Sequence, residues 1–285
     1  MSSDLPLVTF ITVVYNGVSE LEPTIQSILR QSGNRFEYFI IDGGSTDGTI
    51  ELIKKYESQL SGWISEPDRG LYDAMNKGMK LGKGKYLWFM NAGDLVYADD
   101  TLAKIVNLIN GNPITGQEIN KEIQETKNKE PGTQSDKAKN AVNASTPDVI
   151  YGETEIIDEG GRSLGERRLK APAKLNWKSL QWGMVVCHQS FLVKRENCLT
   201  YDSGYRFAAD VDWMIRVLRN SQFILPSGMI LSKFKSGGLT YKNIRHGLKE
   251  RFRIMVKNYG PVKTLFNHVV LGVNLTFYYL RHRRI

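Results

Sequence analysis

The sequence predicts an α/β fold with a mainly parallel central sheet flanked by helices. Over the first ninety residues, apolar runs of strand length alternate with stretches whose apolar residues recur at helical spacing. Residues 7–15 are almost continuously apolar and β-branched, which is typical of a parallel strand covered on both faces. Single helices separate the strands, and this order produces right-handed βαβ units in a Rossmann-like arrangement.

The elements follow one another closely. After the first strand, Asn16-Gly17 forms a break, and apolar residues predict a helix over 21–30. A second strand is expected at 38–41, and Asp47 is expected to cap a helix over 49–56. A third helix is expected over 71–81 and a third strand over 86–90.

The chain divides into two halves and two additions. Residues 112–147 hold no aromatic residue and few large apolar ones, so they cannot bury enough surface to offset their ordering entropy. We therefore expect a mobile polar insertion at 112–147 between a first half at 1–111 and a second half at 148–240. Another helix is expected after Asp210, and 241–285 form a helical tail.

The positive charge belongs to that tail. The net charge is +8, yet residues 241–285 hold ten Lys or Arg and one acid, while the rest is nearly neutral. A nucleic-acid-binding protein would usually spread basic residues over its recognition face, so we expect no nucleic-acid partner.

The tail also contains an apolar stretch at 264–280, which is shorter than the ~20 residues of a membrane-spanning helix. Asn267, Asn274 and Arg281 recur every seven residues and mark one polar stripe. We expect a helix lying on an anionic membrane surface; packing on the body or on a partner subunit is the alternative. No signal peptide is recognised and only two cysteines occur, so a cytoplasmic location at the inner face of the membrane is expected.

Polar clusters follow three of the expected strands. They are Tyr15-Asn16, Asp42 with its Gly-rich turn, and the segment Asn91 to Asp94. Each alone is an ordinary turn, but ligands of parallel sheets bind beyond the carboxyl ends of strands. No dinucleotide fingerprint follows the first strand, and residues 78–85 do not fit a phosphate loop. Nicotinamide enzymes and P-loop enzymes are therefore disfavoured.

Four sequence blocks resemble the family-two glycosyltransferases of the GT-A type. The blocks are VTFITVVYN at 8–16, IDGGSTDGT at 41–49, RGLYDAMNKG at 69–78 and NAGD at 91–94. They cover roughly residues 7–97, and the third most resembles the branch that makes O-antigen and other surface polysaccharides. Residues 148–152, 188–189 and 209–213 are similar to the family's acceptor half, with a weaker signature.

The resemblance implies an inverting transferase of the hexosyltransferase type. Its donor would be a nucleoside-diphosphate sugar, with a UDP-sugar favoured, and its acceptor a lipid-linked or other saccharide. The backbone at Val14, Tyr15 and Asn16 would line the site of the base. Asp42 would accept a hydrogen bond from the imide of that base, and Arg69 would approach the pyrophosphate or the base.

The expected metal motif departs from the family pattern. The usual Asp-x-Asp is replaced by Asn91-Ala92-Gly93, and Asp94 follows one position later. Mg²⁺ or Mn²⁺ on a diphosphate often takes only one or two protein carboxylates. Asp94 would then be the metal ligand, with Asn91 orienting a water or the sugar; the alternative is weakened or lost metal binding.

The resemblance points to Asp210 as the general base that takes the proton of the acceptor hydroxyl. Asp212 is the alternative base, and capping of the following helix is the structural role open to either. Ala209 stands where the family has an acid. His188 is expected to be a core residue more than an acceptor or metal contact. Because of these departures, a non-catalytic nucleotide-sugar-binding or assembly subunit remains the alternative function.

Overall fold

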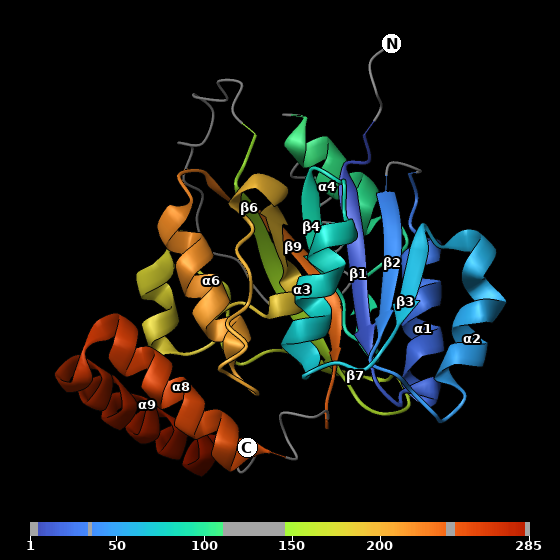
Figure 1. The fold of residues 1–285 in the computed structure, drawn as a ribbon. Coiled ribbons are helices and arrows are strands. Elements are labelled where there is room, and N and C mark those ends of the chain that lie inside the picture. The colour runs from blue at the N-terminus through green and yellow to red at the C-terminus, as the bar shows by residue number, and fades with distance from the viewer. Residues whose placement is uncertain (1–4, 34–35, 111–145, 238–242, 283–285) are drawn as a thin grey trace.

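The computed structural model describes residues 5–33, 36–110, 146–237 and 243–282 (Figure 1). Its first half builds the parallel part of the sheet. The elements are β1 (Val8–Val14), α1 (Val18–Leu29), β2 (Phe36–Asp42), α2 (Thr49–Tyr56), η1 (Glu57–Gln59), β3 (Gly62–Ser65), α3 (Leu71–Leu81) and β4 (Tyr86–Phe89). β1 runs parallel to β2 and β4, and β2 runs parallel to β3. The sequence predicts each of these strands except β3.

The second half extends the sheet with mixed strand directions. After β5 (Leu95–Val96) and α4 (Thr101–Ile109), which complete the first half, the elements of the second half are β6 (Val149–Ile157), β7 (Ser163–Glu166), η2 (Trp177–Trp182), η3 (His188–Ser190), β8 (Phe191–Lys194), η4 (Arg195–Asn197), α6 (Ala209–Asn220) and β9 (Ile224–Lys235). β8 pairs antiparallel with β4 and β6, and β9 pairs parallel with β6 and antiparallel with β5. The strand order is β3-β2-β1-β4-β8-β6-β9-β5, with β7 beside β6. The insertion expected at 112–147 falls almost wholly outside the described residues and stays a prediction.

Helices cover both faces of the sheet (Figure 1). On β1, Ile11 and Val13 pack into the core that includes α3 and α6, whereas Val8 and Phe10 pack into the core that includes α1 and α4. This alternation follows from the two-residue period of a strand. α3 lies very close to β1, since a Cβ added at Gly78 would be 2.4 Å from a methyl carbon of Ile11.

The expected tail consists of two different helices, α8 (Ile244–Tyr259) and α9 (Pro261–His282), which pack on each other. α8 is part of the body, because Ile254 and Met255 are buried in the same core as α6. α8 is therefore packed on the body, and the membrane-association role expected for 241–285 stays a prediction. In the part of the chain that is described, no helix has both the length and the apolar character needed to cross a membrane.

An aromatic cluster joins the two halves of the molecule. His188 is buried, and its Nε2 lies 2.6 Å from the hydroxyl of Tyr201. The Tyr201 ring stacks on Trp213 of α6 at 4.8 Å between centroids, and Phe89 at the end of β4 contacts all three rings. His188 is thus a core residue with its hydrogen bond satisfied, as the sequence favours.

Burial lowers the pKa of His188 to about 4, and the charge of Asp210 opposes this shift. In the unfolded chain a histidine takes up a proton below pH ~6.5. Between pH ~6.5 and 4 the unfolded state therefore binds more protons, and the free energy of unfolding should fall by about 3 kcal/mol as the pH falls. His188→Phe should remove this part of the pH dependence, measured by denaturant unfolding across that range. The same change at exposed His246 should leave the curve as in the wild type; parallel curves for the two variants would contradict the assignment.

The packing of α8 leads to a second expectation. Ile254→Ala should lower the free energy of unfolding by about 2–5 kcal/mol, because it leaves a cavity in a closed core. Leu248→Ala on the exposed side of the same helix should change it by less than about 0.5 kcal/mol. Chemical denaturation of both variants measures the difference, and equal small effects would show that α8 is a loosely attached tail.

Candidate active site

Three strand ends meet at one edge of the sheet, as the sequence predicts. β2, β1 and β4 are neighbours, and the polar residues follow their carboxyl ends. The Gly43 N–H donates to the Val14 carbonyl at 2.9 Å, and the Ala92 N–H donates to the Val13 carbonyl at 3.3 Å. These backbone contacts fix the three turns relative to one another.

Asp42 is fully buried and organises the turn that follows β2. Its Oδ2 accepts hydrogen bonds from the Gly44 N–H (3.1 Å), the Ser45 N–H (3.0 Å) and the Ser65 hydroxyl (2.6 Å). Its Oδ1 accepts from the Ser45 hydroxyl. Each carboxylate oxygen has roughly two acceptor positions, so the capacity left for a ligand lies on Oδ1.

Asn16 ties the first turn to the second. Its φ of 48° is in the left-handed region that asparagine tolerates, its N–H donates to the Ser45 hydroxyl at 2.7 Å, and its Oδ1 accepts from the Thr46 N–H at 2.9 Å. Asp47 serves two helix starts, accepting from the N–H groups of Val18 and Thr49 at 3.1 Å each. Asp47 thus binds the first N–H of α2 from the position before the N-cap residue Gly48, and it binds the first N–H of α1 as well.

The ring of Tyr15 lies beside the backbone of Gly43. The side chain is 67% exposed, whereas the preceding Val14 is buried. A Cβ added at Gly43 would lie 3.3 Å from the Tyr15 ring and 3.1 Å from the carboxylate of Asp68. An exposed aromatic ring next to a glycine is an arrangement on which a planar base can stack.

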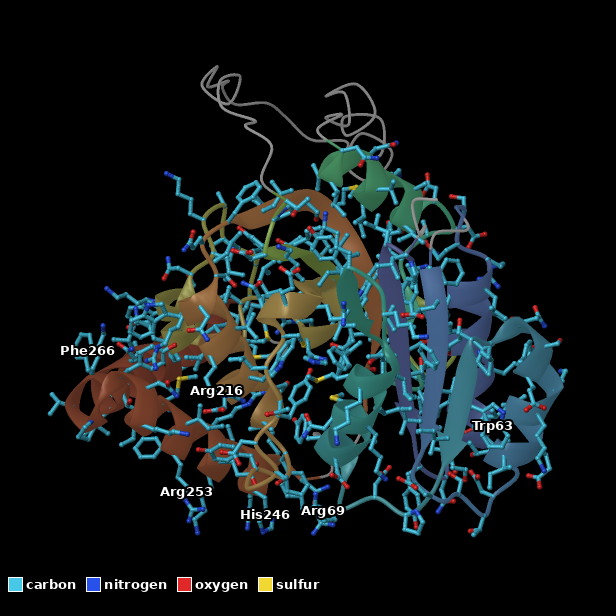
Figure 2. The ribbon with its side chains drawn as sticks, turned by 45° about the horizontal axis from the view of Figure 1, so that its top comes forward. Trp63, Arg69, Arg216, His246, Arg253 and Phe266 are labelled. Carbon is cyan, nitrogen blue, oxygen red and sulfur yellow. The ribbon has the colours of Figure 1, made fainter. Side chains whose placement is uncertain are left out.

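Arg69 lies at the surface just before α3, and Figure 2 shows it on the outside of the molecule. Its Nη2 pairs with the Asp73 carboxylate at 3.0 Å, and its side chain is 80% exposed. The structure thus places Arg69 in a solvent-exposed ion pair; it does not bring the guanidinium into contact with the residues at the strand ends that are described above.

Asp94 is buried where the first half meets the second. Its Oδ2 accepts from the Gln189 amide at 2.5 Å and its Oδ1 accepts from the Lys235 N–H at 3.2 Å. Burial raises the pKa of Asp94 to about 7, and the charge of Glu20 acts in the same direction. A cation beside this carboxylate would favour its ionised form.

The side chain of Asn91 carries a second oxygen in the same turn. The turn is closed by the Asp94 N–H, which donates to the Asn91 carbonyl at 3.0 Å. The Oδ1 of Asn91 is buried without a hydrogen-bond partner among the described residues, a state that costs about 1–3 kcal/mol. No group of three His, Cys, Asp or Glu residues is gathered for a metal in that same portion of the chain. The two side chains therefore fit a divalent cation that completes its coordination with oxygens from a bound diphosphate.

Asp210 and Asp212 have different surroundings. Asp210 begins α6 half-buried, and its Oδ1 accepts from the Tyr72 hydroxyl at 3.1 Å and from the Val211 N–H at 2.9 Å. Asp212 is 1% exposed, with Arg216 Nε at 2.6 Å and Lys257 Nζ at 3.5 Å. Asp212 is therefore part of an ion-paired contact with α8, and Asp210 is the carboxylate that borders the aromatic cluster.

A continuous set of contacts joins Asp94 to Asp210. Asp94 bonds Gln189, which follows His188 in the chain. A hydrogen bond from His188 to Tyr201, a stacked Tyr201–Tyr72 pair and a hydrogen bond from Tyr72 then lead to Asp210. The candidate donor side and the candidate acceptor side are thus parts of one packed structure.

Three residues near Asp94 were given no role in the sequence analysis. Lys235 reaches it from β9, 141 residues beyond Asp94, and its Nζ pairs with Glu20 of α1. No motif marks Lys235 or Glu20. Gln189 lies in a block that resembles the family, so its position carries a signal, but its contact with Asp94 requires the fold.

Comparison with known proteins identifies the family of the chain. Residues 9–197 match the family model described as glycosyl transferase family 2. An uncharacterized glycosyltransferase of Mycobacterium tuberculosis (strain ATCC 25618 / H37Rv) is 36% identical over 107 residues; the match spans 37% of this chain and only 41% of that relative. A PGL/p-HBAD biosynthesis glycosyltransferase of Mycobacterium bovis (strain BCG / Pasteur 1173P2) is 27% identical over 225 residues, 77% of this chain and 72% of that one.

Solved structures confirm the GT-A-type fold. TarS 1–349 of S. aureus in complex with UDP has a TM-score of 0.58 at 14% identity, covering 97% of this chain and 72% of that chain. The mannosyltransferase PcManGT from Pyrobaculum calidifontis, in complex with GDP-Man and Mn²⁺, has a TM-score of 0.58 at 15% identity, covering 94% and 70%. The likeness to these structures concerns the fold, while the family model spans well over half of the sequence. The chain belongs to glycosyl transferase family 2.

Proposed function

We propose that the chain is an inverting hexosyltransferase that moves a sugar from a nucleoside-diphosphate sugar to a lipid-linked or other saccharide acceptor in bacterial surface polysaccharide biosynthesis. The observation that carries this proposal is the packed connection between the carboxylates of Asp94 and Asp210, with the unpartnered Oδ1 of Asn91 in the same turn as Asp94. The name of the mycobacterial relative, a PGL/p-HBAD biosynthesis glycosyltransferase, supports a biosynthetic sugar transfer as the reaction.

The donor would lie over the three strand ends. The Tyr15 ring and the backbone of Val14 and Asn16 would line the base, and Asp42 would accept from its imide through Oδ1. We favour a UDP-sugar; TarS supports this because its structure holds UDP, whereas PcManGT holds GDP-Man. Arg69 would leave its exposed ion pair with Asp73 to contact the diphosphate, a change that costs little because exposed pairs are weak.

The proton transfer is assigned to Asp210. Among the described residues, both hydrogen bonds that its side chain accepts go to Oδ1, which leaves Oδ2 to take the proton of the acceptor hydroxyl. The acceptor oxygen then forms a bond to the anomeric carbon, and the bond from that carbon to the diphosphate oxygen breaks on the opposite face. Mg²⁺ or Mn²⁺, when bound at Asp94 with Asn91 nearby, would neutralise charge on the leaving diphosphate.

A second candidate function is a non-catalytic nucleotide-sugar-binding or assembly subunit. Two observations favour it: Asp94 already accepts two hydrogen bonds from the chain, and Ala209 is buried where the family has an acid. Such a subunit would bind the sugar nucleotide without hydrolysing or transferring it.

Substitution of Asp210 separates these candidates. Asp210→Asn should slow sugar transfer by roughly 10²–10⁴ and leave donor affinity unchanged, because a general base acts on the acceptor. Asp212→Asn is the matched control, and it should lower the melting temperature with a much smaller effect on turnover, since it breaks the pair with Arg216. Steady-state assays with Mn²⁺ and calorimetric donor titration measure both. A reversed order would move the base to Asp212, and an inactive wild type that binds the donor would favour the non-catalytic subunit.

We also propose that the protein works as a peripheral protein at the cytoplasmic face of the membrane, through the outer side of α9. The side of α9 that faces the body is polar, since Thr264 and Asn267 are buried. The opposite side carries a row of apolar residues that are 49–83% exposed: Val262, Leu265, Phe266, Val269 and Val273. Figure 2 shows Phe266 on the outside of the helix pair. This arrangement is the inverse of an ordinary surface helix.

Charge favours a lipid surface over a second copy of the chain as the partner of this face. Exposed basic residues also lie on both helices of the pair, including Arg245 and Arg253 on α8 and Lys263 on α9. Two copies packed through this face would bring their positive charges together. An anionic bilayer supplies apolar burial and about 1 kcal/mol of attraction per basic residue, the two contributions that stable peripheral binding needs.

A charge placed in the apolar row should abolish binding to vesicles. Phe266→Asp should reduce sedimentation with anionic vesicles strongly, because it places a carboxylate at the proposed apolar contact. Leu164→Asp on β7 is the control, because Leu164 is 61% exposed and lies on a different element. Both proteins should retain donor binding. Unchanged sedimentation of the Phe266 variant, or a wild type that dimerises and ignores vesicles, would contradict the membrane assignment.

A further inference from the structure

Glu250 is the acidic residue of the basic segment 241–285, and its carboxylate binds a loop of the second half. Oε1 accepts from the Arg206 N–H at 3.0 Å, and Oε2 accepts from the N–H groups of Phe207 at 2.7 Å and Ala208 at 3.0 Å. Hydrogen bonds from backbone N–H groups to a carboxylate are stronger than those to a neutral acceptor. Glu250 therefore holds three consecutive residues from a distant position in the chain.

Those three residues lead directly into α6 and Asp210. Ala208 is the residue before the helix, and no side chain of its own turn caps it. The N-terminus of a helix carries partial positive charge, which a nearby carboxylate stabilises. Glu250 brings this charge from α8 and binds the N–H of the N-cap residue Ala208 and of the two residues before it, so the path of the chain into Asp210 depends on a residue about forty positions later.

α8 lies beside the proposed acceptor side over much of its length. The ring centroids of Phe207 and His246 are 5.9 Å apart, and Gly247 is buried against the Phe207 side chain. Burial raises the pKa of Tyr72, which donates to Asp210, and the charge of Asp210 adds to this, while the charge of Arg251 on α8 opposes it.

The far end of α8 is also fixed, so Glu250 sits on a rigid support. Lys257 pairs with Asp212 of α6 at 3.5 Å, and Arg219 of α6 donates to the Asn258 carbonyl at 3.1 Å. The Tyr259 hydroxyl donates to the Trp177 carbonyl at 2.5 Å. A carboxylate on a helix that is anchored in this way can define the position of the loop that it binds.

We infer that Glu250 is a positioning residue for the transfer reaction: it holds the loop at 206–208 so that the Asp210 carboxylate stands where the acceptor hydroxyl must be deprotonated. The inference rests on the proposed role of Asp210. It also means that the helix pair proposed to meet the membrane sets the geometry of the acceptor side.

The test compares Glu250→Ala, Glu250→Gln and the control Lys249→Ala, which removes an exposed charge from the adjacent position. Glu250→Ala should lower kcat by about 10–100-fold, because a small misplacement of a reacting group has effects of this size. Donor affinity measured by calorimetry should not change, and the amides of 206–208 should exchange hydrogen faster. Glu250→Gln keeps one acceptor oxygen and should recover part of kcat, whereas Lys249→Ala should behave as the wild type.

An unchanged kcat in Glu250→Ala, in an enzyme that depends on Asp210, would overturn the inference while leaving the proposed function intact. Equal losses in Glu250→Ala and Lys249→Ala would also overturn it, because the loss would then not come from the hydrogen bonds that Glu250 accepts. If the alanine variant does not fold, the glutamine variant provides the test. We expect it to have a lowered kcat and a melting temperature close to that of the wild type. An unchanged kcat would contradict the inference. A wild type that transfers no sugar would contradict the proposed function itself.

Discussion

The buried carboxylate of Asp94 is the polar contact that ties the turn after β4 to the second half of the molecule. A carboxylate with so little exposure to water must find donors within the protein or remain protonated. Its donors come from η3 and from the end of β9, two segments that are far from the first half in sequence. Because Gln189 follows His188 directly in the chain, the contact of Gln189 with Asp94 also positions the aromatic cluster that reaches α6. One polar residue thereby fixes the distance between the turn after β4 and the start of α6.

The donor side is held in another way, by carboxylates that bind their own chain. Asp42 and Asp47 accept mainly backbone N–H and hydroxyl groups of adjacent turns, and Asn16 accepts in the same manner. A ligand at these turns would therefore meet an arrangement that is already ordered, with the Tyr15 ring free beside it. Such preorganisation reduces the entropy lost when a ligand binds.

Much of the first half could be predicted from sequence because its apolar residues recur at the periods of buried strands and amphipathic helices. β3 could not, since its four residues are only half-buried and lack an apolar run. The mixed second half and the position of Lys235 depend on strand pairings between distant segments, which local patterns do not encode. Asp212 and Arg216 are spaced i and i+4 on one helix, so their pairing was a usable signal against Asp212 as the base. The contact of Glu250 with the loop at 206–208 could not be predicted from the sequence, although a single acid among ten basic residues is unusual.

The joint between α8 and α9 has a practical consequence. Gly260 adopts a φ of 84°, a conformation open to glycine, and it separates a helix with core residues from one whose outer side is apolar. A chain shortened at Gly260 would keep Ile254, Met255 and Glu250 in place and would lose the apolar row of α9. A chain shortened before α8 would instead expose the core beneath it. Gly260 is therefore the natural end point for a shortened protein that keeps α8 and lacks the apolar face proposed to meet the membrane.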